Sequence, residues 1–590
     1  MTVRTRCVIP ACLALLFATA VIAAPAAPAV SVAPAVAVAP AASVAPPVSA
    51  KSAAAAGPGH AAIASAHPLA TAAGLEVLRG GGNAFDAAVA VSAALAVVEP
   101  TGSGLTGGGI YLLHRQSDGF ETAIDAREFA PAAASRDMFL DAQGEPVPRL
   151  STDSALAAGI PGEPAGMALL AAKYGRVPVA QSLAPAIRLA RSGFPLTSHL
   201  HEALERRLAQ FAAEPDVARN FLRDGAVPPV GTLIRQPELA ATLEHLAQHG
   251  FDSFYQGELA AQLVAGVRAQ GGIWTEADLS AYRALERAPI VGQYGGARIV
   301  SAPPPSSGGI ALIEALNILS QFDLRGATPV QRKHLVIEAM RRVHRDRALY
   351  LGDPDFIDIP WSRLTSIDYA AGLAASIRLD RATPSTALPG IGAGAAAGPQ
   401  TTHFSVLDRD GNRVAATITV NFGFGTGRMI AGTGLFLNNE MDDFSMKPGV
   451  PNGYGLVGAD ANAIAPHKRM LSSVTPVFVD TGSRVLIGGS PGGSLIIGMS
   501  LLATLDFLDG QSAAAIVGAP RFHQQYLPDV VRYESGAFSD DELKILAAQG
   551  DVLEPSAYRW GNFQAVTWDR TAGKVEAASD PRGEGGGVVE

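Results

Sequence analysis

The stretch "TTHFSVLDRDGNRVAATITVN", residues 401–421, has the pattern of two strands joined by a tight turn. An Asp-Gly pair in its middle is a turn signal, and both flanks alternate between apolar and polar residues. A three-residue loop with Gly411 in the left-handed conformation places Thr401 opposite Thr419. A two-residue loop places Thr401 opposite Val420 instead. In either register the sequence predicts a hairpin that brings Thr401 to the end of the second strand.

Polar side chains repeat along that second strand. Thr417, Thr419 and Asn421 alternate with apolar residues, and the period of two in a strand puts them on one face. Threonine is a good strand residue, so a solvated face is one interpretation. A face that lines a functional site is the other, and the residues before Thr401 favour it.

The segment directly before Thr401 is almost featureless. Residues 381–400 are rich in Gly, Ala and Pro, which is typical of a flexible loop. If the chain were cut between Gln400 and Thr401, Thr401 would carry both a hydroxyl and a free α-amine, and the amine could act as general base for the hydroxyl. We therefore predict a processing junction at which Thr401 attacks the Gln400 carbonyl.

The first residues have the composition of an export signal. Arg4 and Arg6 precede an apolar run that is short for a membrane span, so we expect a signal peptide over 1–23 and a periplasmic or secreted protein. A retained membrane anchor is the alternative. An Ala/Pro-rich linker is expected over 24–58. Both cysteines lie inside the signal, which excludes a disulfide scaffold and a thiol nucleophile in the exported chain.

The overall composition excludes several classes of protein. The chain has 590 residues, of which 48% are hydrophobic and 17% charged, so a sizeable core is expected. A net charge of −9 gives no basic footprint for nucleic acid. No later apolar run reaches the roughly 18 residues of a membrane span, so we expect no stable membrane insertion. The histidines show no paired metal spacing, and we predict no metal and no cofactor.

Helical and strand patterns alternate along the chain. Two helices are expected in 67–100, and the second is apolar on all sides, which indicates burial. Helices dominate 160–283 and 308–378. Further strands are expected near 110–115, 121–126, 287–301, 401–408, 413–421, 473–479 and 484–489, and a helix near 494–508. Strands flanked by helices in both halves predict a layered α/β or α+β core.

Several motifs together resemble one family. "TTHFSVLDRDGNRVAATITVNFGFGTG" is similar to the nucleophile segment of the γ-glutamyltranspeptidase (glutathione hydrolase) family of N-terminal-nucleophile hydrolases. The other motifs are "GGNAFDAAVAV", "DAREFAPAAASRDMFLD", "APPPSSGG", "YLGDPDF", "LNNEMDDFS" (437–445), "KPGVPNGYGLVG" (447–458), "LSSVTP" (471–476) and "GGSPGGS" (488–494). The resemblance covers roughly residues 60–590. It implies an α+β fold, a four-layer αββα sandwich, and self-cleavage into a large subunit (59–400) and a small catalytic subunit (401–590) that form a heterodimer.

The resemblance also implies the reaction. The γ-glutamyl group of glutathione or another γ-glutamyl compound would pass to Thr401, and then to water or to an acceptor amino acid or peptide. Thr419 would be the hydroxyl partner of Thr401, as the hairpin register also suggests. Gly492 and Gly493 would offer backbone N–H groups to the oxyanion. From the residues alone, an ordinary strand-to-helix turn is the alternative for these glycines.

A γ-glutamyl donor carries an α-carboxylate and an α-ammonium, and a selective site must pair both. Arg127 can clamp a carboxylate with two hydrogen bonds, and Ser472 and Ser473 can add hydroxyl donors. The family assigns the acceptors for the ammonium to three residues, which are Asn421, Glu440 and Asp443. A solvated acidic loop is the alternative for "NNEMDDFS". The Gly/Pro-rich loop 447–458 with Tyr454 has the composition of a lid.

Two further segments receive simpler interpretations. "RRVHRDR", residues 341–347, is expected to be a solvated helical face, and "APPPSSGG", residues 302–309, a rigid turn near the site. Two other functions remain open beside the leading one. The same fold could act as an acylase on glutaryl or cephalosporin-type amides, or the chain could be a non-catalytic envelope scaffold.

Overall fold

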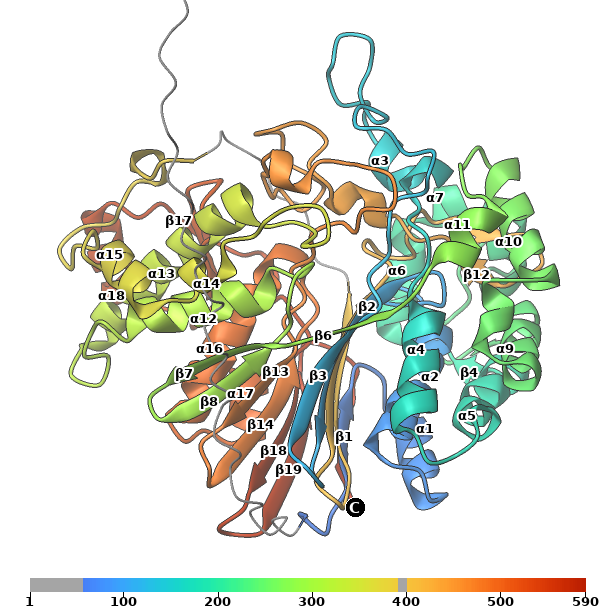
Figure 1. The fold of residues 1–590 in the computed structure, drawn as a ribbon, viewed down its shortest axis with the longest axis horizontal. Helices are drawn as coiled ribbons and strands as arrows, with labels where there is room; N and C mark the ends of the chain where they lie inside the picture. The colour runs from blue at the N-terminus through green and yellow to red at the C-terminus, as the bar shows by residue number, and fades with distance from the viewer. Residues whose placement is uncertain (1–56, 391–400) are drawn as a thin grey trace, which may run out of the picture. The chain divides into compact units, whose positions relative to one another are not determined.

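Two stacked β-sheets lie between two layers of helices (Figure 1). The computed structural model describes residues 57–390 and 401–590. The predicted signal peptide (1–23), nearly all of the predicted linker (24–58) and Gln400 lie outside these residues, and those predictions stay predictions.

The first sheet has seven strands in the order β20-β1-β9-β10-β2-β3-β6, and every neighbouring pair is antiparallel. The strands are β1 Ala62–Ser65, β2 Gly108–Arg115, β3 Phe120–Asp125, β6 Leu285–Arg287, β9 Thr402–Leu407, β10 Arg413–Thr419 and β20 Gly586–Val589. The predicted hairpin thus forms the middle of this sheet.

The second sheet has six strands in the order β19-β18-β14-β13-β8-β7, again antiparallel throughout. The strands are β7 Ile290–Tyr294, β8 Ala297–Ser301, β13 Val477–Asp480, β14 Arg484–Gly489, β18 Gln564–Asp569 and β19 Lys574–Ser579. Both sheets therefore combine strands from either side of residue 400.

Three small sheets complete the strands of the described residues. They pair β4 Phe194–Pro195 with β5 Leu233–Ile234, β11 Met429–Ile430 with β12 Leu435–Phe436, and β16 Val531–Tyr533 with β15 Phe522–His523 and β17 Leu553–Pro555.

Each sheet carries its own helical layer (Figure 1). The first sheet is covered by helices that include α1 Pro68–Arg79, α2 Ala84–Val98, α4 Glu163–Tyr174, α5 Val179–Ser192 and α9 Pro237–His249. The second is covered by α12 Gly308–Leu319, α13 Pro329–Tyr350, α15 Ile367–Ala374, α16 Ile496–Leu508, α17 Ala513–Gly518 and α18 Asp540–Gln549. The remaining α-helices are α3 Leu150–Asp153, α6 Ser198–Arg206, α7 Leu208–Phe211, α8 Pro215–Phe221, α10 Glu258–Ala269, α11 Glu276–Ala281 and α14 Trp361–Leu364. No helix within the described ranges combines the length and apolarity that a membrane crossing requires.

Side chains alternate across the first sheet because successive strand residues point to opposite faces. On β2, Ile110 and Leu112 pack into the apolar layer between the two sheets, while Tyr111 and Leu113 pack toward the helices. A separate apolar cluster joins the second sheet to α12, α13 and α16. The chain therefore has the predicted αββα sandwich.

The turn of the central hairpin settles its register. Gly411 has a φ of 97°, and the N–H of Asp408 donates to the carbonyl of Asn412 at 3.1 Å. Ile418 pairs with Thr402, and continuing that register by one residue places Thr401 opposite Thr419. The three-residue loop is therefore the correct alternative of the two.

Part of the segment that was expected to be flexible is held in place. The N–H of Ala382 donates to Gln549 O at 2.7 Å, that of Thr383 to Glu338 Oε1 at 3.0 Å, and that of Ser385 to Asp529 Oδ2 at 2.7 Å. Composition alone did not reveal these bonds, because their acceptors lie far away in the sequence. Flexibility of the segment remains an expectation only for 391–400, which lie outside the described residues.

Candidate active site

Thr401 lies directly before β9, and its hydroxyl meets Thr419 at the end of β10. The two Oγ1 atoms are 3.4 Å apart. Thr419 Oγ1 also accepts a hydrogen bond of 2.8 Å from the N–H of Asn421, whose φ is 72°. Thr401 is only 7% exposed. The hydroxyl pair is therefore nearly buried. It lies on the same face of β10 as Ala415, which packs into the layer between the two sheets.

A glycine-rich turn lets the backbone pass close to both threonines. A Cβ added to Gly107 would lie 1.9 Å from the carbonyl oxygen of Thr419, and one added to Gly102 would lie 3.0 Å from that of Thr401. Because such contacts are too short for a side chain, only glycine allows this approach at Gly107. The turn closes the site from the side of β2.

The second sheet contributes a tight turn at the end of β14. Gly492 and Gly493 have φ values of 146° and 55°, and α16 follows after one 3₁₀ turn. A Cβ on Gly493 would lie 2.5 Å from the ring of Tyr454. Within the described residues, neither glycine N–H donates a backbone hydrogen bond. Each glycine lines a cavity that Thr401 also lines, so the predicted oxyanion role of their N–H groups stays a prediction.

Arg127 is the centre of a buried ionic cluster. Its guanidinium donates to Glu440 and Asp443, to the carbonyl of Met470 at 3.2 Å, and lies 3.6 Å from Glu128. Glu440 and Asp443 occupy a single 3₁₀ turn that follows β12. Three carboxylates therefore converge on one guanidinium, and an acidic loop exposed to solvent is the wrong interpretation of this segment.

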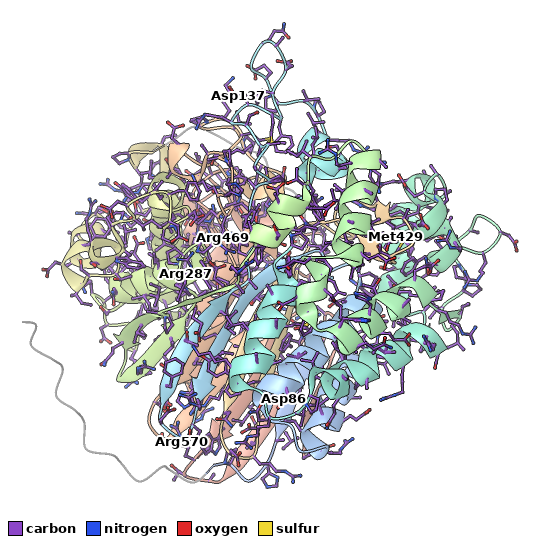
Figure 2. The ribbon with its side chains drawn as sticks, turned by 45° about the vertical axis from the view of Figure 1, so that its right-hand side comes forward. Asp86, Asp137, Arg287, Met429, Arg469 and Arg570 are labelled. Atoms are coloured by element: carbon purple, nitrogen blue, oxygen red, sulfur yellow. The ribbon has the colours of Figure 1, made fainter. Side chains whose placement is uncertain are left out.

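The backbone around Arg127 is fixed by further charges. Asp125 accepts a bond of 3.0 Å from the N–H of Arg127, and it pairs with Arg287 at 2.8 Å and with Arg469 at 3.6 Å. Arg469 also donates to the carbonyl of Arg127 and, at 3.0 Å, to the hydroxyl of Tyr282. Figure 2 places Arg287 and Arg469 near the upper end of the first sheet. These contacts hold the position from which Arg127 reaches the site.

The acids of this cluster outnumber its nearby cations. Burial raises the pKa of Glu440 to about 7 and raises those of Glu128 and Asp443, although the charge of Arg127 lowers all three. Glu440 Oε2 and both Glu128 oxygens accept no hydrogen bond from the described residues. A buried carboxylate without full pairing is costly, so this cluster favours an additional positive group.

Arg347 belongs to the site, although the charged run 341–347 predicted a solvated helical face. It is buried on α13 and donates to Ser307 Oγ at 3.0 Å and to Ser473 Oγ at 3.1 Å. Burial lowers its pKa to about 10, and the charge of Asp443 acts in the opposite direction. The expectation for 341–347 was wrong because carboxylates and hydroxyls from distant segments bury this polar helix.

The two serines have different partners. Ser473 Oγ accepts the bond from Arg347, whereas Ser472 Oγ accepts from the N–H of Val474 at 3.1 Å. The carbonyl of Ser472 accepts bonds from the N–H and the hydroxyl of Ser307. The segment 302–309 therefore lies beside the site, as expected.

Tyr454 closes the site from the loop 447–458. Its hydroxyl donates to the carbonyl of Asn421 at 2.8 Å, and its ring stacks on Phe422 with centroids 4.4 Å apart. Asp442 anchors the loop by accepting from the N–H of Gly453 at 2.8 Å and from Ser151 at 2.7 Å. Sequence reasoning missed Asp442, since nothing local distinguishes it from the acids beside it.

Nearly all of the predicted site residues line one small cavity. They are Arg127, Thr401, Thr419, Asn421, Glu440, Asp443, Tyr454, Ser472, Ser473 and Gly493. The volume open to the centre of a water-sized sphere is about 20 Å³, enough for roughly one water. The loop 447–458 must therefore move before a larger group can enter.

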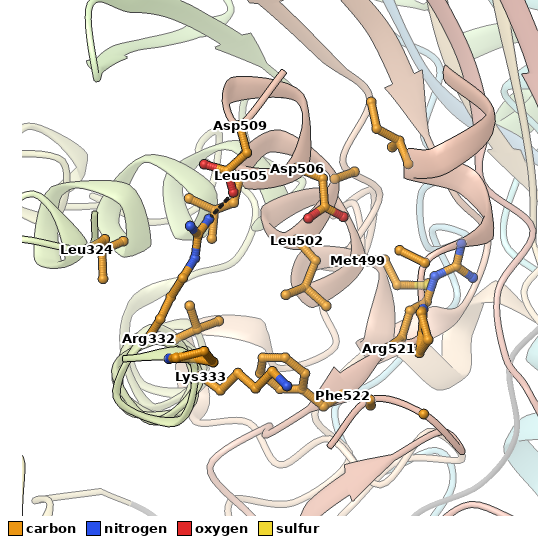
Figure 3. A pocket seen from close by; sticks show the side chains of 18 of the residues that line it. Leu324, Arg332, Lys333, Met499, Leu502, Leu505, Asp506, Asp509, Arg521 and Phe522 are labelled. Atoms are coloured by element: carbon orange, nitrogen blue, oxygen red, sulfur yellow. Dashed lines mark hydrogen bonds and ion pairs between the residues drawn. The ribbon is translucent and has the colours of Figure 1, made fainter. Parts of the chain in front are cut away.

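A much larger cavity lies in the outer helical layer of the second sheet and has none of these residues (Figure 3). By the same measure it has a volume of about 600 Å³, and its lining is mainly apolar. Three of its charged side chains are paired, since Arg332 contacts Asp509 at 2.5 Å, Lys333 contacts Glu542 at 2.7 Å and Arg521 contacts Asp580 at 2.5 Å. Size alone does not mark the site; the convergence of two hydroxyls, an arginine and several acids does.

Comparison with known proteins identifies the family. The family model described as gamma-glutamyltranspeptidase matches residues 70–589. The chain belongs to the γ-glutamyltranspeptidase family. Among related members of this family, the glutathione hydrolase proenzyme of Escherichia coli (strain K12) is 44% identical over 525 residues, 88% of this chain and 90% of that protein. The acylase ACY 1 proenzyme of Pseudomonas sp. (strain V22) is 36% identical over 86% of this chain and 89% of its own length.

Solved structures of relatives agree with this assignment. Cephalosporin acylase from Bacillus halodurans has a TM-score of 0.78 at 28% identity, over 90% of this chain and 95% of that chain. γ-Glutamyltranspeptidase from Helicobacter pylori has a TM-score of 0.53 at 40% identity, over 55% of this chain and 93% of that chain. The resemblance found in the motifs and the N-terminal-nucleophile hydrolase fold are therefore confirmed.

Proposed function

We propose that this γ-glutamyltranspeptidase cuts its own chain between Gln400 and Thr401 and then hydrolyses or transfers γ-glutamyl groups through Thr401. The large subunit would be 59–400 and the small subunit 401–590, held together as a heterodimer. The observation that carries the proposal is the meeting of the Thr401–Thr419 pair with the acid-rich cluster of Arg127 around one cavity.

The chemistry follows from the groups around Thr401. After cleavage its α-amine would take the proton from Oγ, which attacks the carbonyl carbon of the γ-glutamyl amide. The N–H groups of Gly492 and Gly493 would bind the oxyanion, and Thr419 would orient Oγ. The C–N bond then breaks and the amine leaves with a proton. Water or an acceptor amino acid or peptide releases the acyl group from Thr401.

The zwitterionic head of a γ-glutamyl donor fits the cluster by charge. Its α-carboxylate would bind Arg127, with Ser472, Ser473 and Arg347 beside it. Its α-ammonium would bind Glu440, Asp443 and the side chain of Asn421. Because Arg127 already pairs with these acids, the donor inserts one charge of each sign, and the net charge of the buried cluster stays the same.

The acylase relatives make glutaryl amides the second candidate. A glutaryl group has no α-ammonium, so it would bring a carboxylate to the cluster without a cation for Glu440 and Asp443. The test compares release of 4-nitroaniline from γ-glutamyl-4-nitroanilide and glutaryl-4-nitroanilide. We expect kcat/KM to favour the γ-glutamyl compound by about a hundredfold or more, because an unmet charged hydrogen bond costs about 2–3 kcal/mol. Equal or reversed preference would contradict the proposal.

If the protein were a non-catalytic scaffold, it would release 4-nitroaniline from neither compound.

We further propose that the protein is exported to the periplasm or secreted, on the basis of the predicted signal peptide over 1–23. Recovery of activity from the periplasmic or culture fraction of expressing cells, with the new N-terminus read by mass spectrometry, tests this. Activity confined to the cytoplasmic fraction would contradict it.

A further inference from the structure

A second cavity opens on the other side of Thr401. This cavity has a volume of about 620 Å³, against about 20 Å³ for the small cavity, and Thr401 and Gly492 form part of its wall. Gly493 lines the small cavity and Gly492 the large one, so the turn after β14 separates the two. Among the described residues, Thr401 is the one that both linings share.

Glu99 lines this second cavity together with Thr401. It follows the last residue of α2, and its carboxylate accepts a hydrogen bond of 2.6 Å from the hydroxyl of Thr402. Glu99 is half-buried and lines the cavity. A carboxyl group is thus tied to the residue that adjoins Thr401 and faces the space beside it.

The surroundings keep Glu99 without a permanent cation. Burial raises the pKa of Glu99 to about 8, and the hydrogen bond from Thr402 partly lowers it. Its position at the negative C-terminal end of α2 also favours the protonated form. The nearby charge of Glu584 raises this pKa further. No positive group in the described chain contributes to this pKa.

The other titratable groups of the cavity come from several elements. They are His67 before α1, His199, Glu202 and Arg206 on α6, and Arg559, Arg582 and Glu584 from the C-terminal segments. Burial lowers the pKa of His67 to about 4, so its ring is neutral. Arg582 is paired with Glu534 and Asp580. Of the other acids, Glu202 lies 3.9 Å from Arg206, and Glu584 accepts a bond of 2.8 Å from the N–H of His199. Glu99 is bonded to Thr402, so it is the acid best placed to receive a positive group at Thr401.

We propose that this cavity binds the amine partner of the reaction, an amino acid or short peptide with a free α-amine, and that Glu99 holds its ammonium group and takes its proton. This inference rests on the proposed function, since it concerns the second half of the same reaction. It assigns the γ-glutamyl group to the small cavity and the amine to the large one, with Thr401 between them.

The ammonium of the acceptor gives one proton to the Glu99 carboxylate and becomes a nucleophilic amine. Its nitrogen forms a bond to the acyl carbon, and the bond from that carbon to Thr401 Oγ breaks. The second nitrogen proton passes to Oγ by way of the α-amine of Thr401. Glu99 then releases its proton to solvent through the cavity.

The test measures transfer and hydrolysis in one reaction. Mature wild-type protein, Glu99→Gln and the control Glu205→Gln, an exposed carboxylate of α6 outside both cavities, are given γ-glutamyl-4-nitroanilide and glycylglycine at pH 8. Free glutamate and γ-glutamyl-glycylglycine are quantified. We expect Glu99→Gln to keep hydrolysis while its transfer-to-hydrolysis ratio falls about tenfold or more. Glu205→Gln keeps the wild-type ratio.

Hydroxylamine, used as a second acceptor, distinguishes a loss of proton transfer to Glu99 from structural damage to the cavity. Hydroxylamine is much less basic than an α-amine and is already neutral at pH 8, so its transfer should change by less than about twofold in Glu99→Gln. Thr402→Val removes a bond that lowers the pKa of Glu99, so the rise of glycylglycine transfer with pH should move to higher pH.

Two results would overturn the inference. One is an unchanged ratio with glycylglycine in Glu99→Gln; the other is an equal loss with both acceptors. Neither result touches the hydrolase itself. Failure of the wild-type protein to release 4-nitroaniline would instead contradict the proposed function.

Discussion

Two clusters of arginine and carboxylate both include residues of α13 but differ in their pairing. The α13 cluster consists of Arg341, Arg342, Glu338, Asp529 and Asp551. The site cluster consists of Arg127, Arg347, Glu128, Glu440 and Asp443. Each contains two arginines and three acids, so composition does not separate them.

The difference lies in how fully the acids are satisfied. Both oxygens of Glu338 accept bonds, from Arg341 and the N–H of Thr383 on one side and from Arg342 on the other, and its pKa is lowered despite burial. Glu440 has one oxygen without a bond from the described residues, and its pKa is raised to about 7. In the α13 cluster Glu338 is fully paired, and only Asp551 Oδ2 lacks a hydrogen bond from the described residues, with His334 Nδ1 3.9 Å away. The site cluster leaves Glu440 Oε2 and both Glu128 oxygens without such a bond, so it has room for a ligand's positive charge.

The strongest way to break this comparison is to remove one arginine from each cluster. Arg127→Ala should lower kcat/KM for γ-glutamyl-4-nitroanilide about a thousandfold or more, because it removes the carboxylate clamp. Arg341→Ala should instead lower the free energy of unfolding by about 3–5 kcal/mol, since Asp529 and Asp551 lose their arginine and Glu338 keeps only Arg342. Urea unfolding and steady-state kinetics on both variants check this. Equal loss of activity per folded molecule in both would contradict the distinction.

Asp443→Asn should have the next largest effect. It keeps the shape of the side chain but removes a charge from the ammonium side, which is worth about 2–3 kcal/mol or roughly a hundredfold in KM. Cleavage before Thr401 should stay complete, because Asp443 is not among the groups proposed for that step. The kinetics are measured with γ-glutamyl-4-nitroanilide, and cleavage by gel electrophoresis. A normal KM would show that the ammonium binds elsewhere.

The pH dependence of donor binding should reflect Glu440. Its pKa of about 7 means that the carboxyl gains a proton as the pH falls from 8 to 6, so the attraction for an ammonium weakens and KM rises by up to about tenfold. Glu440→Gln should flatten this profile. The same raised pKa predicts that stability falls as the pH rises from about 4.5 to about 7, because the unfolded chain loses this proton first, and Glu440→Gln avoids the loss. An unchanged profile in the variant would contradict the assignment.

Tyr454→Phe should have the smallest effect. The variant loses the 2.8 Å bond to the Asn421 carbonyl but keeps the stacking on Phe422, so the lid is weakened by about 1 kcal/mol. We expect KM for γ-glutamyl-4-nitroanilide to rise about fivefold with little change in stability. A KM within error of the wild type would mean that the hydroxyl does not hold the lid.

The parts of the molecule that local sequence determines were predictable. The hairpin around Gly411 could be read because turn and strand signals are short-range, and the burial of α2 because it is apolar on every side. Arg127, Glu440 and Asp443 were found through motifs of the family. Strands such as β1 and β20 were missed, since four-residue segments rich in Ala and Gly carry little periodicity.

The parts that depend on distant contacts were not predictable. The charged run 341–347 within α13 indicated a solvated face, yet Arg347 is buried because Ser307 and Ser473 reach it from other segments. Its i,i+3 and i,i+4 pairs from Glu338 to Arg341 and Arg342 were a signal that the helix face was organised rather than solvated. Glu99 gave no signal at all, since only the fold places it beside Thr402.

The proposed reaction depends most on Thr401 acting as a newly exposed N-terminus. Intact-mass analysis of purified wild-type protein and Thr401→Ala tests this directly. We predict two polypeptides for the wild type, the smaller one beginning at residue 401, and a single uncut chain without activity for the variant. A wild-type preparation that is fully active while its backbone through residue 401 remains intact would contradict the account.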